Sequence, residues 1–407
     1  MININAAIFL GVEVVLLYAL IFYLSLYMEG ERSNKNKLTK KPMVSILIPA
    51  YNEEKTLYKC ISSTLNLDYP KDKLEVIVIN DGSTDKTREI AESFGSKIKL
   101  INQKNQGKAR AMNNGLKICS GEFVACLDAD SFVNEDTLKK MLSHFNSKIT
   151  AVTPLLKVHN PRTLLQKIQS VEYIIYIFIK KCMNKINAIF VTPGPFTIYR
   201  TEVIKSLGGF DEKSIVEDQE IAYRLQKNQY KIKQSSGGEV YTESPANLKE
   251  FYKQRSRWAR GTIQTIFDYR HMILNPKYGD FGLFQLPLNI FGLVMPFVII
   301  YFLFKTFFLP TYEFILSLIV TNFSLIFTYP NLTDIFLLTN FSNIYFNFVY
   351  LSLFIFIGKK AYNFSNENFM KKDIVFGIIF IVVFYILISL IILCAIFELL
   401  TKKRKKW

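Results

Sequence analysis

Long apolar runs at both ends of the chain restrict its fold more than any other feature. Residues Ala6 to Tyr27 form one such run, interrupted only by Glu13 and Ser25. A helix of that length covers the roughly 30 Å of hydrocarbon in a bilayer. We therefore expect a transmembrane helix. The alternative, a cleaved signal peptide, is disfavoured because no basic residue precedes the run and no small-x-small cleavage site follows it.

The C-terminal part contains four more apolar runs, at 285–309, 312–329, 332–357 and 374–400. Three crossings in this block would keep the lysines within 359–372 in the cytoplasm but place the basic cluster at 402–406 outside, and four would do the reverse. The positive-inside rule cannot satisfy both clusters. We favour four crossings, because Pro310 and the turn at 329–331 break the apolar pattern.

Between these ends the chain has the composition of a soluble α/β domain. Expected strands at 43–49, 74–79, 97–101 and 122–127 alternate with expected helices at 53–65, 84–93 and 107–118. The alternation predicts a mostly parallel sheet with helices on both faces and a ligand site at the carboxyl ends of the strands. The predicted division is a transmembrane helix with a basic linker (1–41), the α/β domain (42–270) and a transmembrane block of three or four helices (271–407).

The formal net charge of +16, from 50 Lys and Arg against 34 Asp and Glu, fits three kinds of partner. These are nucleic acid, an anionic membrane surface and an anionic substrate such as a sugar nucleotide. Basic residues gather beside the apolar runs, as at 32–37 and 402–406, which is typical of juxtamembrane segments. We expect no nucleic-acid partner, because the chain has no recognisable nucleic-acid module. The basic flank after the first run predicts that the α/β domain is cytoplasmic.

Carboxylates follow two of the expected buried strands. Asp128 and Asp130 come directly after 123–127, and Asp81 follows 74–79. The first two could hold a divalent cation through oxygen ligands, and such an ion would neutralise a diphosphate as it leaves. The alternative is a solvated turn. Asp81 could accept hydrogen bonds from a nucleoside, or it could simply belong to the turn before the next helix.

Two further groups of polar residues open helices. Lys108 lies at a helix N-terminus, which suits phosphate, although an ordinary basic helix start explains it equally well. Glu217 and Asp218 precede another helical segment. They could merely complement the helix dipole. We predict that they are catalytic, with Asp218 as the general base that takes a proton from an attacking sugar hydroxyl.

Gln254, Arg257 and Trp258 lie just before the C-terminal apolar block. One interpretation is a juxtamembrane anchor of basic and aromatic residues. The other is a pocket wall, in which Trp258 stacks on the acceptor and Arg257 holds the leaving diphosphate. The two interpretations place Trp258 in lipid headgroups or in a pocket.

Together and in this order, five segments resemble the motifs of membrane-bound family 2 glycosyltransferases, which include synthases of hyaluronan, chitin, cellulose and poly-N-acetylglucosamine. The segments are 44–53, 80–83, 128–130, 217–218 and 254–258. The resemblance implies a GT-A (Rossmann-like) cytoplasmic domain plus α-helical transmembrane segments. It also implies inverting transfer from a UDP-sugar with Mg²⁺ or Mn²⁺.

The resemblance also implies roles for single residues. Asp81 would bind the uridine, Asp128 the nucleotide side and Asp130 the metal, with Asp128 beside it. Asp218 would be the base. Gln254, Arg257 and Trp258 would line the acceptor end and the diphosphate. A loop at 192–200 looks like the family's acceptor loop, and 161–181 is similar to its amphipathic interface helix. Val216 departs from the Thr or Gly that many members carry.

The implied activity is that of a processive synthase in the cell membrane. It would transfer a hexose or N-acetylhexosamine to a growing β-linked polysaccharide and translocate the product through its own helices. The alternative is a non-processive glycosyltransferase that makes a glycolipid. Expected partners are the nucleotide-sugar donor, a polysaccharide or lipid acceptor, membrane lipid, and either a second copy of the chain or an accessory export protein.

Overall fold

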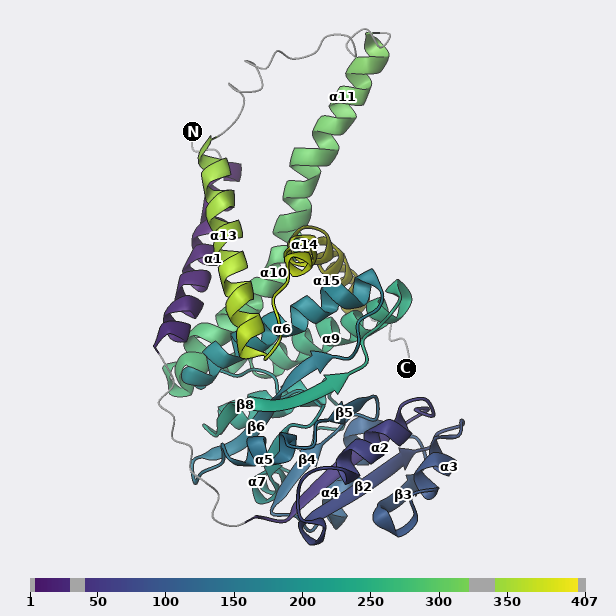
Figure 1. The fold of residues 1–407 in the computed structure, drawn as a ribbon. Coiled ribbons are helices and arrows are strands. Elements are labelled where there is room, and N and C mark those ends of the chain that lie inside the picture. Colours follow the sequence, from purple (N-terminus) through teal and green to yellow (C-terminus); the bar gives the residue numbers. More distant parts are fainter. Residues whose placement is uncertain (1–3, 30–40, 322–340, 402–407) are drawn as a thin grey trace.

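The computed structural model describes residues 4–29, 41–321 and 341–401. Its globular part is built on one eight-stranded sheet in the order β3-β2-β1-β4-β7-β6-β8-β5 (Figure 1). The strands are β1 (Val44–Ala50), β2 (Leu74–Asp81), β3 (Lys99–Gln103), β4 (Phe123–Cys126), β5 (Ser131–Val133), β6 (Ile149–Val158), β7 (Ile198–Arg200) and β8 (Lys231–Thr242).

The N-terminal half of the sheet confirms the sequence prediction. β1 pairs in parallel with β2 and β4, and β2 pairs in parallel with β3. The helices between these strands are α2 (Leu57–Leu65), α3 (Thr87–Glu92) and α4 (Lys108–Ile118). β1, β2 and β4 are buried along nearly their whole length, as expected for parallel strands that are covered on both faces.

The prediction of a mostly parallel sheet is wrong for the other half. β6 and β8 are parallel, but β7 pairs antiparallel with β4 and β6, and β5 pairs antiparallel with β8. Antiparallel pairing needs no crossover helix of its own, and β5 and β7 are only three residues long. Strands this short leave little periodic signal in the sequence.

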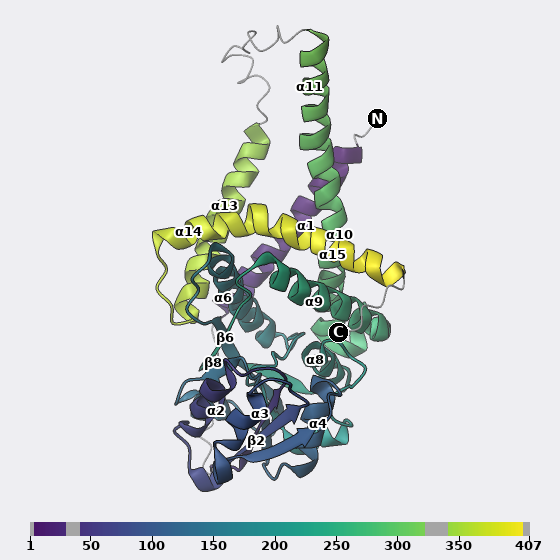
Figure 2. The ribbon, with the colours of Figure 1, turned by 90° about the vertical axis from the view of Figure 1, so that its right-hand side faces the viewer.

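Five helices belong to the C-terminal half of this domain: α5 (Thr137–Leu142), α6 (Leu164–Lys185), α7 (Thr201–Ser206), α8 (Glu217–Lys227) and α9 (Leu248–Asp268). α6 confirms the helix expected at 161–181 and begins with a capping box of Thr163 and Gln166. α6 and α9 lie above the sheet, between it and the apolar helices (Figure 2).

The apolar helices are α1 (Ile4–Met28), α10 (Leu286–Leu303), α11 (Leu309–Val320), α13 (Phe341–Phe364), α14 (Lys371–Ile379) and α15 (Tyr385–Leu400). Within the described residues, three segments are long and apolar enough to cross a membrane: Leu10–Met28, Phe281–Val320 and Lys371–Leu400. The length and composition of these segments favour membrane association. α13 stands beside α1, where the Tyr350 hydroxyl donates to the Glu13 carbonyl oxygen at 2.7 Å.

The predicted break at Pro310 is wrong. Phe281–Val320 is one continuous helical segment, in which a π-helical turn at Phe304–Phe308 precedes α11. Proline removes one hydrogen-bond donor and crowds the preceding turn, and the wider π turn accommodates this without ending the helix. The predicted runs 312–329 and 332–357 lie partly outside the described residues. Three other features lie outside the described residues: the turn at 329–331, most of the basic linker, and the cluster at 402–406.

α14 and α15 are joined by a π-helical turn at Phe380–Phe384 and form one helical segment. This segment runs crosswise to α1, α11 and α13 and lies over α6 and α9 (Figure 2).

Candidate active site

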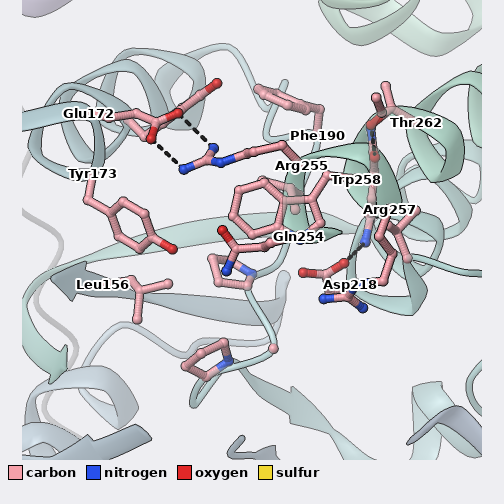
Figure 3. Close-up of a pocket in the computed structure, with 18 of the residues that line it drawn as sticks. Leu156, Glu172, Tyr173, Phe190, Asp218, Gln254, Arg255, Arg257, Trp258 and Thr262 are labelled. Atoms are coloured by element: carbon pink, nitrogen blue, oxygen red, sulfur yellow. Dashed lines mark hydrogen bonds and ion pairs between the residues drawn. The ribbon is translucent and has the colours of Figure 1, made fainter. Parts of the chain in front are cut away.

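A cavity of about 480 Å³ is lined by Asp128 and Asp130, just beyond the carboxyl end of β4, and by residues of α10 and α15. Figure 3 shows it in close-up. Eight of the predicted site residues line it: Lys108, Asp128, Asp130, Glu217, Asp218, Gln254, Arg257 and Trp258. Its size is typical of small-molecule sites. The eight residues come from the loop after β4, from the first residues of α4 and α8, and from α9. The loop after β4 and the start of α4 meet here because the carboxyl ends of the parallel strands share one edge of the sheet.

The carboxylate pair after β4 lies at the floor of this cavity. The Ser131 hydroxyl donates to Asp130 Oδ1 at 2.8 Å. Burial, followed by the charge of Asp128, raises the pKa of Asp130 to about 7, although the Ser131 hydroxyl opposes the shift. Neighbouring carboxylates disfavour each other's ionisation. A positive charge bound beside Asp128 and Asp130 would therefore be stabilised.

Lys108, the first residue of α4, joins two of the carboxylates. Its Nζ lies 2.6 Å from Asp128 Oδ1 and 2.8 Å from Glu217 Oε1. Burial alone would lower the pKa of Lys108, but the two carboxylates outweigh it and raise this pKa well above its usual value. The predicted phosphate-facing lysine therefore already bridges the end of β4 and the start of α8.

Glu217 and Asp218 form the first turn of α8. Burial would raise the pKa of Glu217, but the Lys108 ammonium outweighs it and lowers this pKa. Asp218 differs, because burial and then the charge of Glu217 raise its pKa to about 6. Thr192 fixes the turn, since its backbone N–H and its hydroxyl both donate to the Asp218 carbonyl oxygen, at 3.2 and 2.8 Å. A carboxyl with this pKa is ionised at neutral pH and can still accept a proton.

Gln254, Arg257 and Trp258 point from α9 into the cavity (Figure 3). Trp258 therefore lies in a pocket wall, as the second interpretation expects. Among the described residues, Gln254 Oε1 is buried with no hydrogen-bond partner. An unpaired buried acceptor is costly unless a ligand donates to it.

A buried ion pair that also lines the cavity was not predicted from the sequence. Arg255 donates from Nη1 and Nη2 to the two carboxylate oxygens of Glu172 on α6, at 2.8 and 2.6 Å (Figure 3). The guanidinium carbon lies 4.4 Å from the centre of the Trp258 ring. The pair thus joins α6 to α9 and supports the aromatic wall. Glu172 and Arg255 fall within the segments 161–181 and 254–258, but no local pattern links positions so far apart in the chain.

Lys180 was also missed. It lies one helical turn after Tyr176 and two turns after Tyr173 on α6, and all three line the cavity. Lys180 is only 5% exposed, and burial lowers its pKa to about 8, although the charge of Asp218 opposes this shift. An amphipathic helix pattern alone does not say which of its polar residues face a pocket.

Two glycines set the spacing of the site. A β-carbon at Gly261 on α9 would lie 2.5 Å from both Val216 methyl groups, so α8 and α9 can approach this closely only with glycine at 261. Val216, the departure from the family pattern, is therefore a packing residue against α9. A β-carbon at Gly194 would lie 2.8 Å from Lys108 Nζ and 3.0 Å from Asp128 Oδ2, so the predicted acceptor loop passes directly over the charged floor.

Asp81 is the exception among the predicted residues. It is buried at the end of β2. Among the described residues that line this cavity, Asp81 is not included. Its Oδ1 accepts from Gln103 Nε2 and the Gln106 backbone N–H, at 2.7 and 2.9 Å, and its Oδ2 accepts from the Gly107 backbone N–H at 2.9 Å. Asp81 thus fixes the loop that leads into α4, and its contact with uridine stays a prediction.

The residues at the floor fit a hard divalent cation. Asp128 and Asp130 supply only oxygen donors, which Mg²⁺ and Mn²⁺ prefer. Burial, and after it the charge of Asp128, raises the pKa of Asp130, and a cation would offset both effects. No group of three or more His, Cys, Asp or Glu residues that could hold a metal occurs among the described residues. A bound ion would therefore need the donor's phosphates and water as further ligands, which is usual for Mg²⁺.

Comparison with known proteins agrees with this geometry. Residues 45–208 match the family model described as glycosyl transferase family 2. Poly-beta-1,6-N-acetyl-D-glucosamine synthase of Staphylococcus epidermidis is 37% identical over 224 residues, which is 54% of this chain and 54% of that protein. The synthase of the same name from Staphylococcus aureus strain COL is 34% identical over 251 residues, 58% of this chain and 60% of that protein. The match thus spans little more than half the length of these curated relatives.

Among solved structures, the mannosyltransferase PcManGT from Pyrobaculum calidifontis, determined in complex with GDP-Man and Mn²⁺, has a TM-score of 0.60. It is 19% identical in sequence, and the likeness covers 92% of this chain and 96% of that one. At this level of identity the likeness shows a shared fold.

Proposed function

We propose a reaction for this chain, which carries a glycosyltransferase family 2 domain of GT-A fold at residues 45–208 and is therefore an enzyme. The chain transfers an N-acetylhexosamine or hexose from a UDP-sugar to a growing β-linked polysaccharide, with inversion at the anomeric carbon. One observation carries the proposal: a single cavity is lined by a carboxylate that can act as a base, an arginine, a carboxylate pair and several aromatic rings. They are Asp218, Arg257, Asp128 with Asp130, and Trp258, Tyr173 and Tyr176.

Asp218 acts as the base. The acceptor hydroxyl oxygen forms a bond to the anomeric carbon, the bond from that carbon to the phosphate oxygen breaks, and the electron pair leaves with the UDP. The hydroxyl proton passes to Asp218. The raised pKa of Asp218, about 6, suits a group that must be ionised beforehand and protonated afterwards.

Arg257 and the carboxylate pair handle the leaving diphosphate. Arg257 lies in the cavity wall close enough to Asp218 to oppose the rise in its pKa, and its planar guanidinium can bind a phosphate through two hydrogen bonds. A divalent ion held by Asp128 and Asp130, when bound, neutralises charge on the diphosphate. Lys108 keeps Asp128 and Glu217 in place.

The acceptor sugar lies against Trp258, Tyr173 and Tyr176, which all line the cavity. Aromatic faces pack well against the apolar faces of sugar rings, and the unpaired Gln254 Oε1 can accept a hydrogen bond from a sugar hydroxyl. The curated relatives, both named as N-acetylglucosamine polymer synthases, support an N-acetylhexosamine polymer as the product. Its route onward runs between α10 and α15, which supply the membrane-side wall of the cavity.

A second candidate is transfer of a single sugar to a lipid. It is favoured by the composition of that membrane-side wall, where Leu288 and Leu293 of α10 face Ile388 and Ile391 of α15. Such a wall offers an acyl or prenyl chain better contacts than it offers a sugar polymer.

The test is incubation of the purified full-length chain, reconstituted in lipid, with a panel of radiolabelled UDP-sugars. We expect one donor to yield a ladder of oligomers that remain water-soluble. A single-sugar product that extracts into organic solvent would instead establish the second candidate. Asp218→Asn should lower the rate by at least about 10²-fold, whereas the matched change Asp72→Asn, at an exposed surface position, should leave it unchanged.

A further inference from the structure

The segment Lys371–Leu400 is one of three that are long and apolar enough to span a bilayer. Thirty residues of helix measure about 45 Å, so length alone permits a crossing. Its direction does not, because it runs crosswise to α1, α11 and α13 (Figure 2). Helices that run crosswise to each other cannot all lie along the membrane normal.

Both ends of this segment are held by the same globular domain. Just before its first residue, Glu367 Oε1 lies 2.9 Å from Nζ of Lys157 on β6, and Asn366 Nδ2 donates to Glu239 Oε1 on β8 at 3.1 Å. The Lys157 side chain is only 5% exposed and the Glu367 side chain 41%, so the contact is partly shielded on the domain side. The entry to α14 is therefore fixed on the domain.

The far end is fixed on α9. Glu398 accepts a hydrogen bond from the Tyr252 hydroxyl at 3.3 Å, and its other oxygen lies 3.7 Å from Arg260 Nη1. Between the two ends, Phe384 packs on Phe251 with ring centres 5.1 Å apart, and Ile391 and Ala395 are buried. A crossing helix would carry its two ends to opposite faces of the membrane, and one domain could not bind both.

We propose that Lys371–Leu400 does not cross the membrane but lies in its surface layer, on the side of the catalytic domain, and covers the active-site cavity. The partner of its outward face is the lipid bilayer. That face exposes large apolar side chains along the whole segment, among them Val375 (55% exposed), Val382 (56%), Leu390 (47%) and Phe397 (65%). It adjoins α10, which belongs to another of the apolar segments.

The basic residues agree with this arrangement. With α1, Phe281–Val320 and α13 as the crossings, Lys359, Lys360 and the lysines that open α14 lie on the same side as the basic cluster at 402–406. Neither three nor four crossings in the C-terminal block achieves this. A helix that does not cross satisfies the positive-inside rule for both clusters.

The inner face of the helix then has a functional consequence. Ile388, Ile391 and Ile392 line the cavity, so a helix that contacts lipid on one side closes the active site on the other. The position of this helix is the same whichever sugar the enzyme transfers.

Depth measurements on the full-length chain in lipid vesicles test the proposal. In a Cys394→Ser background, which removes the exposed native cysteine, a nitroxide is attached to Val375→Cys, Val382→Cys or Phe397→Cys. We expect three similar depths. A crossing helix would place position 382 about 10 Å deeper than position 375 and make position 397 shallow again, and that profile would overturn the proposal. Leu10→Cys and Leu16→Cys, both exposed on α1, are the controls, and position 16, at the middle of that helix, should lie about 9 Å deeper than position 10.

A second measurement determines sidedness. The exposed position 368 is labelled as Asn368→Cys with a membrane-impermeant maleimide, and a C-terminal epitope tag is probed with protease from either face of the vesicle. We expect label and tag on the same side, and an N-terminal tag on the other. A C-terminal tag on the side opposite to position 368 would overturn the proposal. Retained sugar transfer shows that each variant is folded.

Discussion

Removal of one partner of the Glu172–Arg255 pair should destabilise the domain and impair transfer, and these two effects can be separated. Both side chains are almost fully buried, at 2% and 7% exposure, and two hydrogen bonds join them. Glu172→Gln leaves the Arg255 guanidinium charged and without its counter-ion. Breaking a buried pair in this way costs about 3–5 kcal/mol, which corresponds to a fall in melting temperature of roughly 6–20 °C for a domain of this size.

Replacing both partners should behave differently. Burial raises the pKa of Glu172 in spite of Arg255, so the loss of hydration outweighs the attraction and the pair contributes little net stability. Apolar residues of similar volume often replace buried ion pairs without loss. We therefore expect Glu172→Leu with Arg255→Met, which leaves no buried polar group unpaired, to recover most of the melting temperature. Transfer should stay impaired, because the cation 4.4 Å from the Trp258 ring is gone.

The assay is thermal unfolding in detergent together with turnover of the UDP-sugar, for both single variants and the double variant. Glu202→Gln, at an exposed position of α7, is the matched control and should change neither quantity. If the double variant melts as low as Glu172→Gln does, an uncompensated buried charge is not the cause of the instability. If its turnover is normal, the pair does not support Trp258.

Three further predictions concern the cavity. Transfer should fall as the pH drops through about 6, the pKa of Asp218. Because that folded-state pKa is raised, the stability that Asp218 contributes is fully present below its unfolded pKa of about 4 and is lost as the pH rises through 6. Protonation of Asp218 therefore does not unfold the domain in acid. A transfer rate that stays flat down to pH 5 would reject Asp218 as the base. Asp130→Asn should raise the divalent-ion concentration needed for half-maximal transfer at least about tenfold. The control Asp136→Asn, on the surface, should leave that concentration unchanged. An unchanged metal titration in Asp130→Asn would show that Asp130 does not hold the metal. Gly261→Ala, which brings a β-carbon to 2.5 Å from the Val216 methyls, should lower the free energy of unfolding by about 1–3 kcal/mol. Adding Val216→Ala should restore the melting temperature. If Gly261→Ala alone melts like the unchanged protein, the close approach of α8 and α9 does not require glycine.

Much of the site could be predicted because its residues sit where local patterns end. Asp128 and Asp130 follow a buried strand, Glu217 and Asp218 begin a helix, and Trp258 lies in a short run of basic residues. Strand ends and helix starts are local features, and parallel strands bring such ends to one edge of a sheet. Eight of the nine predicted residues therefore line one cavity.

The residues that were missed depend on contacts between distant segments. Lys180 and Tyr176 look like ordinary members of an amphipathic helix, and the roles of Glu172 and Arg255 appear only when α6 and α9 pack together. The use of Asp81 in fixing the loop before α4 likewise needs the pairing of β2 with β3. No period or motif in one segment reports what another segment places beside it.

The presence of apolar helices around an α/β domain can be deduced from the residues alone, because burial and membrane insertion both follow from the local density of apolar side chains. The direction of those helices emerges only when distant segments pack together. Composition could not distinguish a crossing from a helix that lies flat over the active site, since Lys371–Leu400 is equally apolar in either case. The polar contacts of Glu367 and Glu398 with one domain make that choice, and they join residues that are far apart in the chain.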